Sequence, residues 1–171
     1  MKEWRREEFA WAGPGDFVRL DALCADLLRD FFRWLQAPEG GDLPGDRAAP
    51  LAHAADRYLR DFAVDIAEAG PADADPSLPR RYLANWYIVH TLTPSHPEID
   101  RIRQALVLLH RYLAETGIAD TETALAAQEQ LGDAGFFHER LEAFWGLTPE
   151  GISAWRSVED YPRARRSAPC P

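Results

Sequence analysis

The 171-residue sequence contains two cysteines and one methionine, against six tryptophans, five tyrosines and eight phenylalanines. Two cysteines cannot build the disulfide framework of a small secreted domain, so we expect reduced thiols and a cytoplasmic protein. Because the sequence has many rigid aromatic rings and almost no methionine, the side-chain packing of the interior should be well defined rather than adaptable. The sequence also lacks an apolar run of the roughly 20 residues that a membrane-spanning helix needs, which argues against membrane insertion.

Motifs that carry chemistry are missing as well. The two glycines around Pro14 have neither a preceding strand nor a following Lys-Ser/Thr, which excludes a phosphate-binding loop. The sequence contains no serine nucleophile elbow and no Cys–His pairing at a meaningful spacing. We therefore expect no catalytic residues and no cofactor, and we predict that the protein is not an enzyme.

The net charge of −9 is distributed unevenly along the chain. Residues 37–79 carry three arginines against nine acids, and residues 112–161 carry two arginines against ten acids. Between them, residues 80–111 carry five arginines against two acids, so this segment has a charge of +3. The surface as a whole should repel nucleic acids and anionic membranes, whereas the middle segment could attract an acidic partner locally.

Hydrophobic residues recur at intervals of three and four over most of the chain, which predicts amphipathic helices and no strand of useful length. We expect helices over residues 17–37, 50–69, 79–92, 99–115, 121–131, 136–145 and 148–160. The clearest apolar stripe belongs to the fourth of these helices and consists of Ile99, Ile102, Leu106, Leu109 and Leu113. The sequence predicts an all-α, single-domain bundle over residues 1–161, with the first four helices as its core and residues 162–171 as a flexible tail.

Capping residues and prolines support these boundaries. Asp16 is a suitable N-cap for the first helix, and Asp120 or Thr121 for the fifth. Pro50 is expected in the first turn of the second helix, where its missing N–H does no harm. Ser95 and Glu98 match a capping box before the fourth helix. The third helix is apolar nearly all round and should be central and buried; its apolar residues are Tyr82, Leu83, Trp86, Tyr87, Ile88, Val89 and Leu92.

One face of the fourth helix is the first candidate binding surface. Its residues recur at i, i+4, i+7 and i+8, which would place a basic stripe beside an exposed valine; they are Arg103, Val107, His110 and Arg111. Such a surface could meet an acidic protein partner, a second copy of the chain, or phosphate. The alternative is an ordinary solvated helix face.

The aromatic face of the third helix is the second candidate. Trp86, Tyr87 and His90 could line a pocket for a small molecule, in which the titration of His90 would be shifted toward catalytic use. The alternative is a core histidine that makes one hydrogen bond to a neighbouring backbone group or tyrosine.

The pair His138 and Glu142 and the carboxylate Asp21 are interpreted as structural rather than functional features. His138 and Glu142 share a helix face at i, i+4, but a metal site needs three or four ligands, so we expect a solvated face and no metal. Asp21 projects between Cys24 and Leu28 on the apolar side of the first helix, where burial would raise its pKa. Its place near the helix start favours a simple interaction with the helix dipole instead.

Three stretches resemble parts of one known family: DLLRDFFRWL (residues 26–35), RYLRDF (57–62) and IRQALVLLHRYLAETGI (102–118). They are similar to helices of the SAM-like, core-binding N-terminal domain of tyrosine recombinases and phage integrases. The resemblance covers residues 23–120 and implies a small helical bundle that grips DNA. The family's catalytic domain has no counterpart in residues 119–171, and this chain is acidic where the family is basic. The sequence therefore favours a non-enzymatic interaction, adaptor or regulatory module, with a DNA-binding module as the alternative.

Overall fold

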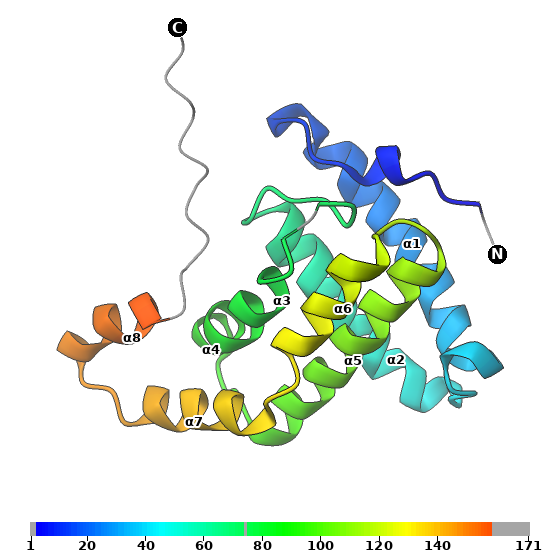
Figure 1. The fold of residues 1–171 in the computed structure, drawn as a ribbon. Coiled ribbons are helices and arrows are strands. Elements are labelled where there is room, and N and C mark those ends of the chain that lie inside the picture. The colour runs from blue at the N-terminus through cyan, green and yellow to red at the C-terminus, as the bar shows by residue number, and fades with distance from the viewer. Residues whose placement is uncertain (1–2, 74, 159–171) are drawn as a thin grey trace, which may run out of the picture.

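The computed structural model describes residues 3–73 and 75–158, and all regular secondary structure in these two ranges is helical. The all-α prediction is therefore confirmed. Figure 1 shows the longer helices packed side by side, with α7 (Ala134–Trp145) and α8 (Ile152–Val158) extending to one side of them. One continuous cluster of buried hydrophobic residues joins these elements. The tail predicted at residues 162–171 lies outside the described residues.

Helix α1 (Phe17–Gln36) buries the apolar stripe that its sequence predicts; the buried residues are Leu20, Cys24, Leu27, Leu28, Phe31, Trp34 and Leu35. Asp16 stands directly before the helix but makes no side-chain cap. Its carboxylate instead accepts a hydrogen bond from the Ala12 backbone N–H at 2.8 Å and pairs with Arg19 at 2.8 Å. Asp16 therefore links the N-terminal segment to α1 instead of capping the N-terminus of that helix.

Helix α2 (Gly45–Asp56) begins five residues earlier than expected, so Pro50 lies inside it and the prediction of a first-turn proline was wrong. The helix starts early because the Pro44 carbonyl accepts hydrogen bonds from the N–H groups of Arg47 and Ala48, both at 2.9 Å. A π-helical segment, Arg57–Val64, continues it. The early start moves Asp46 and Arg47 from a predicted loop onto the helix.

The third predicted helix is central and buried, as expected, and consists of three consecutive segments. They are α3 (Leu78–Arg81), a π-helical turn (Tyr82–Trp86) and α4 (Tyr87–His90). Leu92 is the exception, since its side chain is fully exposed. The helix ends at His90 because Thr91 has an extended backbone, with φ −112° and ψ 128°, which carries Leu92 away from the core.

Helix α5 (His96–Glu115) lies at the centre of the bundle, between α2 and α6 (Thr121–Gln130). Its predicted stripe is confirmed, since all five of those residues are buried. Ser95 occupies the N-cap position, but no side-chain hydrogen bond forms, so the capping box is absent. Asp120 caps α6 as predicted, accepting a hydrogen bond from the Thr123 N–H at 2.8 Å. Across the described part of the chain, every helix is too short or too polar to cross a bilayer.

Candidate functional site

The four residues of the predicted basic stripe do not form one exposed surface. His110 is only 9% exposed, and Val107 is half-buried against the core. Arg103 reaches the Leu131 carbonyl through Nη1 at 3.4 Å. Arg111 pairs with Glu115 at 2.8 Å, and its guanidinium carbon lies 5.4 Å from the centre of the Trp34 ring. The interpretation of this face as a solvent-facing stripe was wrong, because α2 and α6 cover much of α5.

His110 also contributes no charge at neutral pH. Burial lowers the pKa of His110 to about 4, because the protein interior disfavours the imidazolium. Its ring centre lies 6.0 Å from that of Tyr58 on the neighbouring π-helical segment, Arg57–Val64. His110 is thus a neutral core residue rather than a cation available to a partner.

Trp86, Tyr87 and His90 do not line a shared pocket of the kind that the sequence predicted. Trp86 and Tyr87 are buried, whereas His90 is exposed and stacks on Trp86 with ring centres 4.6 Å apart. The His90 Nδ1 lies 2.8 Å from the Trp86 carbonyl oxygen. None of the three residues lines either of the two cavities described below or the small pocket that adjoins the second.

His138 and Glu142 meet side chains of α5 that sequence spacing does not reveal. The His138 Nε2 lies 3.1 Å from Asp100 Oδ1, and the His138 ring centre lies 4.5 Å from that of His96. Glu142 Oε1 lies 3.8 Å from His96 Nε2. Residues 3–73 and 75–158 contain no group of three or more His, Cys, Asp or Glu side chains placed to hold a metal ion.

Asp21 has a specific partner rather than a general interaction with the helix dipole. It is the fifth residue of α1, beyond the first turn, and its carboxylate accepts hydrogen bonds from Arg60 Nε at 2.7 Å and Nη2 at 3.3 Å. Arg60 also reaches Asp56 at 3.2 Å. The dipole interpretation was therefore wrong, because the packing of α1 against the π-helical segment brings Arg60 to Asp21.

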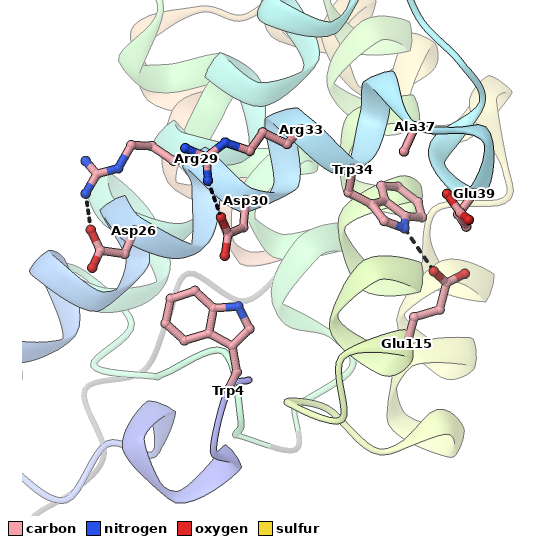
Figure 2. Close-up of a pocket in the computed structure, with 9 residues that line it drawn as sticks. All are labelled: Trp4, Asp26, Arg29, Asp30, Arg33, Trp34, Ala37, Glu39 and Glu115. Atoms are coloured by element: carbon pink, nitrogen blue, oxygen red, sulfur yellow. Dashed lines mark hydrogen bonds and ion pairs between the residues drawn. The ribbon is translucent and has the colours of Figure 1, made fainter. Parts of the chain in front are cut away.

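A cavity of about 700 Å³ lies between the N-terminal segment, α1 and the end of α5. Figure 2 shows that most of its charged groups neutralise one another: Arg29 pairs with Asp26 and Arg33 pairs with Asp30. The Trp34 Nε1 donates to Glu115 at 3.0 Å. A ligand that entered this cavity would compete with these pairs, which makes it a weak candidate for recognition of charge.

A second cavity, of about 690 Å³, lies between α2 and α5. Its lining residues are Leu43, Asp46, Arg47, Pro50, Leu51, Pro97, Asp100, Arg101, Arg103 and Gln104. A pocket of about 80 Å³ shares Pro50 and Arg101 with it and is otherwise lined by His53, Ala54, Arg57, Tyr82, Glu98 and Ile102. We call the cavity and the adjoining pocket together the α2–α5 groove.

Two arginines of the α2–α5 groove have no partner within the described residues. Arg47 and Arg101 are exposed, and neither side chain makes an ion pair, hydrogen bond or ring contact there. Every other arginine in these ranges makes at least one such contact. The groove therefore offers two unpaired guanidinium groups, beside the carboxylates of Asp46 and Asp100, in a chain whose net charge is −9.

Sequence reasoning missed this site in part. Arg47 fell in a predicted loop, and its proximity to Arg101 follows only from the packing of α2 on α5. The +3 charge of residues 80–111 was the available signal, since Arg101 and Arg103 both belong to that segment.

No family model matches this chain, and no curated protein or solved structure matches it at a significant level. A functional assignment must therefore come from the geometry and charge of the groove itself.

Proposed function

We propose that this protein is a non-enzymatic, cytosolic interaction module that binds an acidic segment of another protein in the α2–α5 groove. The observation that carries the proposal is that Arg47 and Arg101, the two arginines without a partner in the described residues, line the same groove. Neither of these two arginines has an existing ion pair that binding would have to break.

The chemistry of the groove suits carboxylates on an extended segment. Arginine presents five N–H donors in a planar fork that matches the geometry of a carboxylate. Apolar side chains lie beside the two arginines and offer contacts to the rest of the segment; they are Leu43, Pro50, Leu51 and Pro97. The groove thus combines charge recognition with a hydrophobic surface, as protein interfaces do.

Two further features support binding to a protein rather than catalysis or binding to DNA. The lining residues include no serine, threonine, cysteine or lysine that would act as a nucleophile. The net charge of −9 opposes approach to duplex DNA at long range, whereas a short acidic peptide can respond to the local field of the groove.

Fluorescence anisotropy with a labelled oligoglutamate peptide tests the proposal. The wild-type protein should bind the peptide at low salt and release it as salt increases. The double variant Arg47→Glu/Arg101→Glu should bind at least about tenfold more weakly, because two attractive charges become repulsive. Thermal unfolding should be unchanged, since neither side chain has a partner to lose.

The matched control is Arg5→Glu/Arg29→Glu, which makes the same change in net charge at two exposed positions outside the groove. It should bind oligoglutamate as the wild type does. Absence of wild-type binding at low salt, equal weakening by the control, or tighter binding of duplex DNA than of the peptide would each overturn the proposal. Self-association that disappears in the Arg47/Arg101 variant would replace the acidic partner with a second copy of the chain.

A further inference from the structure

The small pocket at one end of the α2–α5 groove contains a buried hydroxyl group. Tyr82 has no exposed surface, and its hydroxyl makes no hydrogen bond to any of the described residues. A buried polar group without a partner is destabilising, so native proteins rarely keep one without a reason. Tyr82 is one of the residues that line the pocket of about 80 Å³.

The charges that act on the Tyr82 hydroxyl include those of two residues that line the pocket. Burial raises the pKa of Tyr82, the charge of Arg57 lowers it, and the charges of Asp61 and Glu98 raise it; Arg57 and Glu98 line the same pocket. The hydroxyl is therefore protonated at neutral pH and can donate a hydrogen bond. An acceptor held close to Arg57 and Arg101 is the natural partner for such a donor.

The size and charge of the pocket limit what that acceptor can be. A volume of about 80 Å³ admits a group of a few heavy atoms but not an aromatic ring or a sugar. Glu98 is the one acid that lines the pocket beside Arg57 and Arg101. Burial raises the pKa of Tyr87, and the nearby Glu98 raises it further. The residues that line the pocket carry one excess positive charge, although Arg57 also pairs with Asp61, 4.0 Å away and outside the lining. A singly charged anion fits this balance.

We infer that this pocket is the recognition site for one carboxylate of the acidic segment, which accepts a hydrogen bond from the Tyr82 hydroxyl and pairs with Arg57 and Arg101. The inference rests on the proposed function, because the carboxylate belongs to the segment bound in the α2–α5 groove. That carboxylate belongs either to an acidic side chain or to the C-terminus of the segment.

The variant Tyr82→Phe separates the hydroxyl from the packing of the ring. The ring keeps its contacts with Tyr58 and Trp86, whose centres lie 5.4 and 5.6 Å away, while the donor is removed. We expect the affinity for labelled oligoglutamate to fall about tenfold, the loss typical of one hydrogen bond to a charged group. The melting temperature of the free protein should stay the same or rise, because the variant no longer buries an unpaired hydroxyl.

Tyr58→Phe is the matched control, since Tyr58 is also buried, contacts the Tyr82 ring and does not line the pocket. It should leave the affinity for oligoglutamate unchanged. A C-terminally amidated oligoglutamate then distinguishes the two possible sources of the bound carboxylate. Weaker binding than that of the unmodified peptide identifies the terminal carboxylate, and equal binding identifies a side chain.

The two hypotheses fail in different ways. If the wild-type protein does not bind oligoglutamate, the proposed function fails and the inference fails with it. If the wild type binds oligoglutamate and Tyr82→Phe binds it equally well, the inference about the carboxylate pocket is wrong, while the proposal that the α2–α5 groove binds an acidic segment is retained. A loss shared by Tyr82→Phe and Tyr58→Phe would likewise contradict a specific role for the Tyr82 hydroxyl.

Discussion

Arg140 and Trp155 hold each other through three reciprocal contacts. The Arg140 Nη1 donates to the Trp155 carbonyl at 3.1 Å, and the Trp155 Nε1 donates to the Arg140 carbonyl at 3.2 Å. The guanidinium carbon also lies 3.8 Å from the centre of the Trp155 ring. Arg140 Nε also donates to the Ala84 carbonyl at 3.2 Å, so the same side chain links α7 and α8 to the π-helical turn Tyr82–Trp86.

Replacement of Arg140 should therefore destabilise the C-terminal part of the molecule. Arg140→Leu removes the donors to two carbonyl groups, those of Ala84 and Trp155, and we expect the free energy of unfolding to fall by about 3 kcal/mol. Urea denaturation measures the change. Glu139→Ala, one residue away on the exposed side of α7, is the control and should cost little. Similar losses for the two variants would mean that the Arg140 contacts do not stabilise the fold.

Gly70 is expected to tolerate no side chain. A Cβ atom there would lie 1.8 Å from the Phe9 carbonyl oxygen, so Gly70→Ala must push the N-terminal segment away from the body. We expect a loss of about 2–3 kcal/mol in thermal or chemical unfolding, together with faster proteolysis near Phe9. Gly15→Ala should be neutral, because a Cβ atom there meets nothing within 4 Å.

The central stripe of α5 should not tolerate a charge. Leu109 has no exposed surface, and Leu109→Asp would bury an unpaired carboxylate, which should lower the free energy of unfolding by more than about 4 kcal/mol or prevent folding. Glu129→Ala, at an exposed position of α6, should change it by less than about 0.5 kcal/mol. Circular dichroism melts of both variants give the comparison, and equal effects would contradict the burial of this stripe.

His110 should make stability depend on pH on the acid side of neutrality. Its pKa is about 4 in the folded protein against an ordinary value of 6.5, because burial disfavours the charged ring. Above pH 6.5 neither state binds the proton, and the full stability is present. As the pH falls from 6.5 to about 4, the unfolded state takes up a proton that the folded state does not, so stability should decrease by about 3 kcal/mol.

The measurement is the free energy of unfolding as a function of pH for the wild type and for His110→Gln, which cannot titrate. The difference between the two curves should change across this window and stay constant above pH 6.5. A difference that does not vary with pH would mean that His110 titrates normally in the folded protein.

The sequence alone was sufficient for features that depend on neighbours along one helix. The period of three and four predicts which face of α5 is buried, because a helix places residues at that spacing on one side. The Asp120 cap was also predictable, since it needs only the N–H of Thr123, three residues away. Errors at helix starts came from backbone bonds that composition does not reveal, as at Pro44 and Ser95.

The candidate site depends instead on how the helices lie against one another. Arg47 and Arg101 are 54 positions apart in the sequence, and Asp21 lies 39 positions from Arg60. Periodicity predicts that each helix has a buried face, but it does not predict the rotation and offset at which two such faces meet. Only the packing of α2 on α5 brings the unpaired arginines to one groove, and the same packing turns His110 from a predicted surface cation into a neutral core residue.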